Sequence, residues 1–234
     1  MAAGKVITGF SKPYVAVYSA SGGTVTYSKG MELARGVGVS TDYEVGDSNP
    51  FYANNVEAEN VPGVFTGGTA TLTVDGLFAE AEELIFGLPE PESFEYGADK
   101  TVQVRNYGEA AVPPYVGIGF IIRYMSGGVT TYAPYVLTKS RFQMSGNEAN
   151  TQEESIEWQT RELTADLMRD DTPQKNFQKI FDDQETETEA EEILKAFFKI
   201  TGGGAEDGKH NRWRERISAS IDRAGLFRYF RPLP

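Results

Sequence analysis

Histidine and cysteine, the residues most often used for nucleophilic catalysis and metal binding, are almost missing from this 234-residue sequence. There is no cysteine, which excludes disulfides, thiolate nucleophiles and cysteine-bound metals. The single histidine, His210, follows a glycine triplet at 202–204. A base in such a place is not held within hydrogen-bond reach of a nucleophile, as acyl transfer requires. We therefore expect no histidine-based catalysis.

Carboxylates are the remaining residues with potential chemistry. The densest acidic cluster, Asp182, Asp183, Glu185 and Glu187, lacks the glycine turn and the ligand spacing of a calcium loop, so a solvated acidic linker explains it better. Two carboxylates can serve a glycosidase, but no spacing marks a pair among the 34 acidic residues. We expect no metal, no cofactor and no enzymatic activity, with a carboxylate-based hydrolase as an open alternative.

The stretch 66–88 predicts the elements around which the chain is organised. Over 69–74, apolar and threonine side chains alternate, as in a strand with one buried face. Apolar residues then recur at helical spacing over 77–88. Asp75 is the expected N-cap of this helix and Gly87 its expected C-cap. The segment thus predicts a strand followed by one short helix.

Further alternating runs predict a sheet. Residues 14–18 and 24–27 flank Gly22 and Gly23 and read as a hairpin, and 116–124 and 129–142 form a second hairpin around a Met-Ser-Gly-Gly turn. Each hairpin needs a tight turn, which the paired glycines supply. We therefore expect several antiparallel strands.

The other strand predictions are less regular. A third run, 36–45, should direct Val37 and Val39 inward. Pro134 should place the second arm of the later hairpin at a sheet edge or at a bulge. In the last run, 155–168, the apolar parity shifts, which predicts a bulge or bend near its middle.

Three segments break the strand pattern. Residues 46–65 form a long inter-strand loop in this interpretation, and Phe51 and Tyr52 suggest that it docks on another surface. Residues 89–100 predict a proline-punctuated loop before a short strand at 101–105. After the acidic block, the apolar spacing over 193–198 predicts a short C-terminal helix that packs on the chain's own sheet.

Charge divides the chain into two expected parts. Residues 1–200 carry 15 lysines and arginines against 30 aspartates and glutamates, whereas 201–234 carry 7 against 4, which together give the net charge of −12. We expect one domain at 1–200 and a basic extension at 201–234. An acidic domain neutralises few phosphates, so tight nucleic-acid binding is not expected. The first residues show no signal-peptide pattern and the most apolar run, 116–122, is too short to cross a bilayer, so no membrane association is expected.

Taken in order, these segments resemble the major tail protein of long, flexible-tailed bacteriophages, the subunit of the tail tube. The resemblance is carried by YVAVYSASGGTVTYSKGMELARGVGVS at 14–40, NPFYANNVEAENVPGVFTGGTATLTVDGL at 49–77, YVGIGFIIRY at 115–124 and SIEWQTRELTADLM at 155–168. It covers roughly residues 5–200 and includes no catalytic signature.

The resemblance implies a mainly β fold, a β-sandwich or split barrel with one flanking α-helix, a long inter-strand loop and a short C-terminal helix. It also implies hexameric rings that stack into a tube, through which DNA passes without tight binding. The implied partners are copies of the chain itself and the tape-measure, tail-tip and tail-terminator proteins. The implied location is the virion, after synthesis in the host bacterial cytoplasm. Proteins of this family are expected to end near the helix at 193–198, so the role of the basic extension stays open.

The resemblance assigns two sets of candidate residues. The long loop would reach a neighbouring subunit or ring through Asp47, Asn49, Phe51, Tyr52 and Phe65. The acidic lumen candidates are Asp42, Glu44, Glu154 and Glu157. The alternative is a β-sandwich module that binds carbohydrate or serves adhesion, with Tyr52, Tyr132 and Tyr135 as its aromatic platform.

Overall fold

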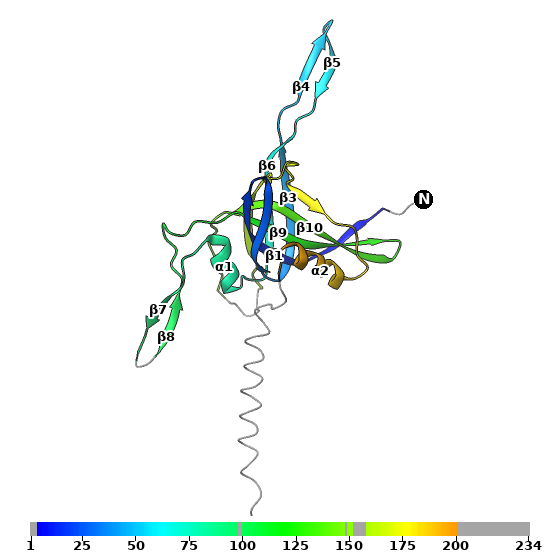
Figure 1. Ribbon diagram of the computed structural model, residues 1–234. Helices are drawn as coiled ribbons and strands as arrows, with labels where there is room; N and C mark the ends of the chain where they lie inside the picture. Colours follow the sequence, from blue (N-terminus) through cyan, green and yellow to red (C-terminus); the bar gives the residue numbers. More distant parts are fainter. Residues whose placement is uncertain (1–3, 98–99, 148, 152–157, 201–234) are drawn as a thin grey trace, which may run out of the picture. The chain divides into compact units, whose positions relative to one another are not determined.

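Antiparallel β-structure dominates the computed structural model, which describes residues 4–97, 100–147, 149–151 and 158–200 (Figure 1). The strands are β1 (Val6–Ser21), β2 (Thr24–Glu32), β3 (Gly36–Val45), β4 (Asn49–Ala53), β5 (Val56–Val61), β6 (Phe65–Val74), β7 (Glu92–Glu95), β8 (Thr101–Val104), β9 (Val116–Ser126), β10 (Val129–Phe142), β11 (Arg161–Met168) and β12 (Gln178–Ile180). The helices are α1 (Ala79–Phe86) and α2 (Glu187–Phe197).

Eight of these strands form one sheet. Its order is β2-β1-β9-β10-β11-β6-β3, and β12 pairs with β10 beside β11. The sheet curls, so that β3 at one end packs against β1 near the other, where the ring of Phe10 covers Gly36. Because the described strands leave β2 and β3 as ends, the sheet is sandwich-like and not a closed barrel. The mainly β class predicted from the sequence is confirmed.

The two predicted glycine hairpins are present. Gly22 and Gly23 join β1 to β2 with φ angles of 57° and 78°, and Gly127 and Gly128 join β9 to β10 with 58° and 83°. Positive φ at both central residues gives a turn whose twist matches that of the flanking strands, and glycine adopts it without a steric penalty.

The strand and helix predicted within 66–88 are present, with one correction at the helix start. The alternation in β6 is confirmed, and Gly87 ends α1 in the left-handed conformation. The N-cap, however, is Phe78, and no side chain caps the helix there. Asp75 instead accepts a hydrogen bond from the backbone N–H of Arg35 at 3.1 Å and pairs with the guanidinium of the same residue. A partner from the connection between β2 and β3 has therefore displaced the local cap.

Pro134 does not lie in an edge strand. β10 has β9 on one side and β11 and β12 on the other. Pro134 pairs in register with Ile121, and the register shift falls between Leu137 and Ser140. The Pro134 carbonyl accepts a hydrogen bond from the backbone N–H of Phe181, one residue beyond β12. The missing N–H of the proline therefore points to a place where the short neighbouring strand has already ended.

Two other strand predictions need correction. Val37 is 56% exposed, whereas Val39 packs against the core as predicted. The strand predicted over 155–168 begins only at Arg161, so no bulge is needed there, and its buried residues alternate as expected. Residues 152–157 lie outside the described part of the chain.

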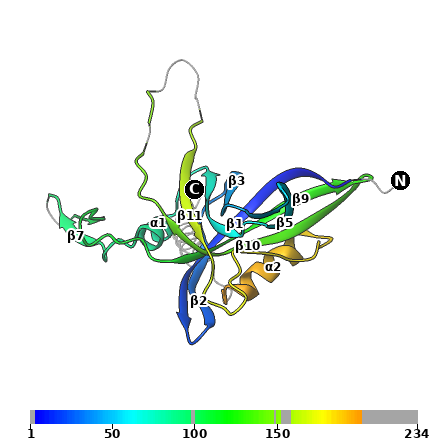
Figure 2. The same ribbon diagram turned by 90° about the horizontal axis from the view of Figure 1, so that it is seen from above.

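Two apolar clusters lie on opposite faces of the sheet. Alternate residues of β9 divide between them, with Ile118 and Phe120 in the first cluster and Ile121 in the second. The curled sheet encloses the first cluster, to which α1 adds Ile85 and Phe86. The second cluster is covered by α2, which packs against β9 and β10 (Figure 2). Both helices therefore bury apolar side chains against the sheet.

The C-terminal helix packs on the chain's own sheet, as predicted. Thr186 caps it, accepting a hydrogen bond from the Glu189 N–H at 3.2 Å while the Glu189 carboxylate accepts one from the Thr186 N–H at 3.1 Å. Ala190, Leu194 and Phe198 are fully buried in the second cluster. This reciprocal cap fixes the helix start, and the apolar face fixes its position.

Candidate interaction surfaces

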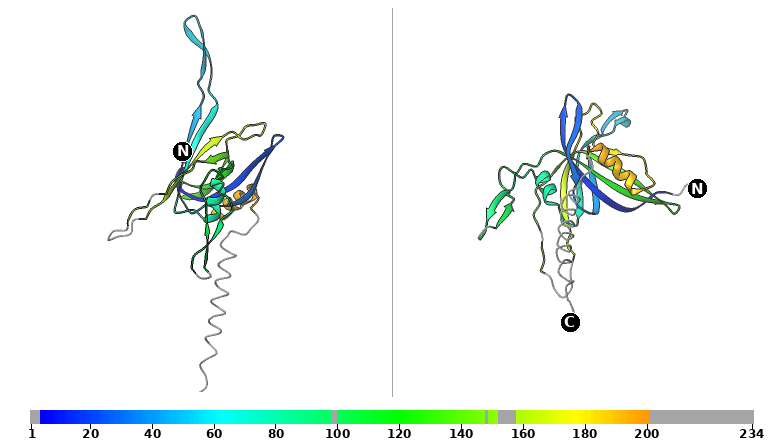
Figure 3. Two further views of the ribbon diagram at one scale, coloured as in Figure 1. Left: turned by 90° about the vertical axis from the view of Figure 1, so that its left-hand side faces the viewer. Right: turned by 60° about the horizontal axis from the view of Figure 1, so that its bottom comes forward.

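The segment predicted as an irregular loop is a projecting hairpin. β4 and β5 pair only with each other, and Asn54 and Asn55 form the turn with φ angles of 53° and 64°. Figure 1 and Figure 3 show the hairpin extending away from the main sheet. At its base, the Gly46 N–H donates a hydrogen bond to the Val64 carbonyl at 2.9 Å. The sequence predicted a long loop here, and the structure shows that this loop is a hairpin, because Asn54 and Asn55 adopt the positive φ angles of a tight turn.

This β4–β5 hairpin carries apolar side chains that the described chain does not bury. Phe51 and Tyr52 are 62% and 60% exposed. Further exposed apolar residues lie along the hairpin and its base, namely Val45, Val56, Val61 and Val64. Single exposed apolar residues are normal, but a group on one projecting element marks an interaction site.

The residues predicted for inter-subunit contact separate into two places. Asp47, Asn49, Phe51 and Tyr52 are exposed on the hairpin or its base. Phe65 is only 8% exposed and stacks on Phe177 with ring centroids 4.0 Å apart. Its side chain belongs to the core, so we leave Phe65 out of the candidate surface.

The acidic candidates are only partly described. Asp42 and Glu44 are exposed on β3, and Tyr43 between them packs on the opposite face against Phe65 and Phe177. β3 is an end strand of the sheet, so both carboxylates lie at a free edge of the described structure. Glu154 and Glu157 lie outside the described residues.

A second arm was not predicted. β7 and β8 form a two-stranded sheet of their own, which extends from the region of α1 (Figure 1). All of β7 is exposed, and Phe94 opposes Val102 across the pair. The sequence predicted β8 but not β7, because the prolines within 89–91 favoured a loop over the segment that contains β7. We call residues 92–104 the β7–β8 arm.

The proposed aromatic platform does not form. Tyr132 and Tyr135 are on opposite faces of β10, because Tyr132 packs on the second apolar cluster and Tyr135 on the first. Tyr135 also stacks on Phe120 and shares a hydrogen bond with the Tyr124 hydroxyl. Tyr52 lies in a different sheet. The three tyrosines therefore offer no common surface to a sugar ring.

The acidic block at 182–187 is not simply a solvated linker. Asp183 pairs with Lys5 at 2.5 Å and accepts a hydrogen bond from the Thr131 hydroxyl at 2.8 Å. Glu187 accepts a hydrogen bond from Ser11. Four residues on, Glu191 accepts a hydrogen bond from the Tyr14 hydroxyl at 2.6 Å. These carboxylates attach α2 and the segment before it to β1 and β10.

The carboxylates that attach α2 should make stability depend on pH. The hydrogen bond from Lys5 lowers the pKa of Asp183 although partial burial opposes it. Burial also opposes ionisation of Glu191, but hydrogen bonds from Lys195 and Tyr14 outweigh it and the pKa falls. A lowered folded-state pKa stabilises the fold fully above the unfolded value of about 4, and this contribution is lost as the pH falls through the folded value.

We therefore expect the urea midpoint to fall as the pH drops below about 4, and E191Q to flatten this dependence. The comparison is urea unfolding of both proteins at pH 7 and at pH 3. E192Q, on an exposed residue of the same helix, is the control and should leave the dependence unchanged. If E191Q and the parent chain show the same pH dependence, Glu191 does not contribute in this way.

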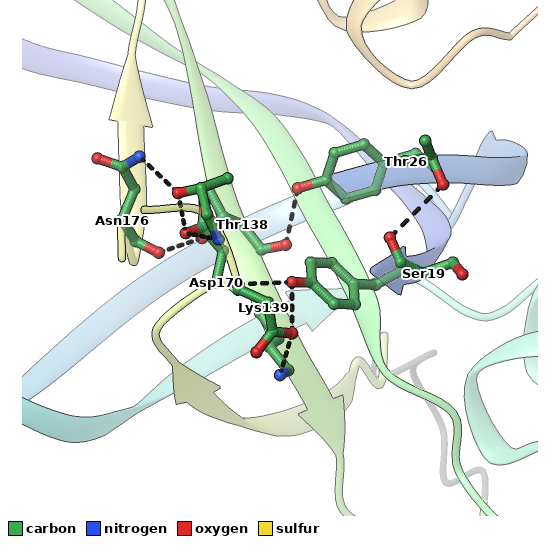
Figure 4. A network of polar contacts seen from close by, with 10 residues as sticks. Ser19, Thr26, Thr138, Lys139, Asp170 and Asn176 are labelled. Carbon is green, nitrogen blue, oxygen red and sulfur yellow. Dashed lines mark hydrogen bonds and ion pairs between the residues drawn. The ribbon is translucent and has the colours of Figure 1, made fainter. Parts of the chain in front are cut away.

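A polar network beside β2 has a structural explanation (Figure 4). The Tyr18 hydroxyl donates to the Asp171 carboxylate at 2.8 Å, and burial raises the pKa of Tyr18 to about 12. Lys139 pairs with the same carboxylate at 2.7 Å and lowers the pKa of Asp171. The Thr138 hydroxyl donates to the Asn176 carbonyl at 2.8 Å. These contacts attach the segment between β11 and β12 to the sheet.

No cluster of three or more histidine, cysteine or acidic residues that could hold a metal ion occurs in 4–97, 100–147, 149–151 or 158–200. Neither described helix is long and apolar enough to cross a membrane. No protein-family model matches the chain, and no curated protein matches it significantly. The surfaces of the described structure that could bind a partner are the β4–β5 hairpin, the β7–β8 arm and the free edges of β2 and β3.

Proposed function

We propose that this chain is a structural protein that assembles with copies of itself, as the tail-tube subunit of a long-tailed bacteriophage. The observation that carries the proposal is the β4–β5 hairpin, whose aromatic residues Phe51 and Tyr52 stay exposed outside the folded core. Covering apolar area of this kind gains about 25 cal/mol per Å². A second copy of the chain is the partner that the resemblance implies.

The ends of the sheet support the same proposal. β2 and β3 each pair with one neighbour only among the described strands. Unpaired strand edges invite pairing with another chain, and a closed ring of identical subunits removes this liability. The proposal therefore accounts for both the free edges and the projecting hairpin.

The charge of the chain fits a conduit for DNA. Residues 1–200 carry 30 acidic against 15 basic residues, and Asp42 and Glu44 are exposed on the end strand β3. An acidic wall repels phosphates, so DNA passes without being retained. In this proposal the ring partners are further copies of the chain, the tube partners are tape-measure, tail-tip and tail-terminator proteins, and the assembled tube belongs to the virion.

Negative-stain electron microscopy and sedimentation velocity across a concentration series test the proposal. Hollow rings or tubes that appear with rising concentration are the expected result, because identical subunits supply every contact. The same samples should be screened against a glycan array. A chain that sediments as a monomer at every concentration and binds a glycan saturably would instead be a carbohydrate-binding or adhesion module.

A further inference from the structure

Several lysines near the end of α2 have no acidic partner in the described structure. Lys5, Lys12, Lys139 and Lys195 each form an ion pair. Within the described residues, no carboxylate pairs with a further set of lysines, namely Lys29, Lys175, Lys179 and Lys199. In a domain with twice as many acidic as basic residues, such unpaired cations gathered in one region call for an explanation.

Two of these lysines line one cavity, and the other two lie close in sequence to residues that line it. Lys179 and Lys199 line it, Lys175 follows the lining residue Gln174, and Lys29 lies two residues beyond the lining residue Tyr27. The cavity holds about 380 Å³ and opens to solvent. We call it the lysine cavity. It lies between the β1–β2 turn, the segment before β12 and the end of α2.

The wall of the lysine cavity is partly aromatic. Tyr27 and Phe197 both line it, and their ring centroids are 5.1 Å apart. The buried carboxylate of Asp170 also belongs to the lining, but it accepts hydrogen bonds from the N–H and hydroxyl of Thr172 at 3.2 and 2.5 Å. Neither lysine pairs with Asp170, and two lysines against one carboxylate leave the lining with a net positive charge, so the cavity suits an acidic group attached to an apolar one.

The β7–β8 arm presents this combination. Glu92 and Phe94 lie on one face of β7 because successive strand residues alternate, and Val102 opposes Phe94 on β8. Phe94 is 58% exposed. Glu92 and Glu95 are exposed, and within the described residues neither forms an ion pair. The arm is thus acidic and apolar, and neither property has a partner among the residues that the structure describes.

We propose that the β7–β8 arm of one subunit docks in the lysine cavity of the next subunit. Phe94 packs against Tyr27 and Phe197, and Glu92, on the same face of the arm, pairs with Lys179 and Lys199. This inference rests on the proposed self-assembly and names one contact that holds neighbouring subunits together. The partner is a second copy of the chain, which the complementary charge of the two surfaces favours.

The positions of the two surfaces suit a ring. The arm and α2 lie on opposite sides of the sheet in Figure 2 and in the right-hand view of Figure 3. A contact between two different surfaces is heterologous, and repeating it head to tail gives a closed ring or an open filament. One arm and one cavity per subunit are therefore sufficient for continued assembly.

Cysteine cross-linking tests the contact directly, because the natural chain has no cysteine to interfere. The full-length double variant V104C/Q174C places one thiol on the face of the arm that carries Glu92 and Phe94, since Val104 opposes Glu92 across the pair, and one at the cavity. After assembly and mild oxidation, we expect a ladder of covalent oligomers on a denaturing gel. Each single variant should give no species larger than a dimer. A53C/Q174C, with the first thiol on the β4–β5 hairpin, is the matched control and should give no ladder.

Charge reversal gives an independent test. E92K makes the docking face of the arm basic, and K179E/K199E makes the cavity acidic. Each variant alone should need about tenfold or more protein to assemble, because like charges then meet at the contact. An equimolar mixture should assemble almost as the parent chain does, since a basic arm meets an acidic cavity and an acidic arm meets a basic cavity in alternation.

The outcomes separate this inference from the proposed function. A parent chain that never assembles contradicts both. A parent chain that forms rings or tubes while V104C/Q174C gives no ladder contradicts the docking alone. A ladder from A53C/Q174C only would assign the cavity to the β4–β5 hairpin and would also overturn the inference. Failure of the equimolar mixture to recover, with each variant folded by circular dichroism, would contradict the charge pairing.

Discussion

Replacing Phe198 with alanine should lower the free energy of unfolding by about 3–5 kcal/mol, the range for truncating a fully buried phenylalanine. Phe198 follows α2, and none of its surface is exposed. Its ring meets those of Tyr27 and Phe197 edge to face, with centroids 5.2 Å apart in both pairs. The residue therefore connects the C-terminal helix to the strands beneath it.

The backbone beneath Phe198 explains why the loss should be large. A Cβ at Gly119 would lie 2.5 Å from the ring atom Cε2 of Phe198, and a Cβ at Gly117 would lie 2.8 Å from Cε1. The two glycines thus form a groove in β9 that fits this ring. Because β9 is held between β1 and β10, the groove cannot close when the ring is removed, and a cavity remains.

Urea unfolding followed by far-ultraviolet circular dichroism measures the effect. Fluorescence is a poor probe, because Trp158 is 88% exposed and changes its surroundings little on unfolding. F197A is the matched control: Phe197 is adjacent and aromatic but only partly buried, so its loss should be clearly smaller. Equal losses for the two variants would show that the glycine groove does not hold Phe198 as described.

The sequence allowed the sheet to be predicted where one face of a strand is buried. In β6 the buried residues Ala70, Leu72 and Val74 alternate with half-exposed threonines. The alternation in the sequence therefore matches the buried and exposed faces of the strand. In β5 every residue is exposed, and no alternation between apolar and polar residues is required. The two projecting hairpins were missed or read as loops for this reason.

Contacts between distant parts of the chain were also beyond prediction from local patterns. Asp75 has the position and chemistry of a helix cap, but Arg35, which lies 40 residues earlier, takes its carboxylate. Glu191 reads as part of a solvated acidic run, yet it accepts a hydrogen bond from Tyr14, 177 residues away. Local sequence spacing indicates which contact a residue tends to form. Its actual partner depends on which distant segments the fold brings close to it.

The candidate interaction residues, too, could be predicted only in part from local patterns. Phe51 and Tyr52 were selected as aromatic residues in a segment rich in turn residues, and the structure places both on an exposed hairpin. Phe65 was selected with them, but it begins β6, where a register shift against β3 between Gly67 and Phe65 accompanies its burial in the same cluster as Ala70. The lysine cavity combines residues from 23 to 199, so only the fold brings them together.

The double variant F51A/Y52A should weaken assembly strongly while leaving the folded subunit intact. Both side chains are about three-fifths exposed and belong to neither apolar cluster, so their loss should change the free energy of unfolding by no more than about 0.5 kcal/mol. At an interface the same rings are expected to act as anchors worth about 2 kcal/mol each. Losing both should raise the protein concentration needed for assembly by at least about 100-fold.

The exchange F51Y/Y52F is the matched control, because it keeps both aromatic rings and moves only the hydroxyl group. It should assemble at nearly the parent concentration, whereas F51A/Y52A should sediment as a folded monomer with the parent's circular dichroism and urea midpoint. If F51A/Y52A forms tubes at the parent concentration, the β4–β5 hairpin is not part of the interface. The exposed aromatic residues would then lose their role in assembly, while docking of the β7–β8 arm in the lysine cavity would stay testable, since it uses a separate surface.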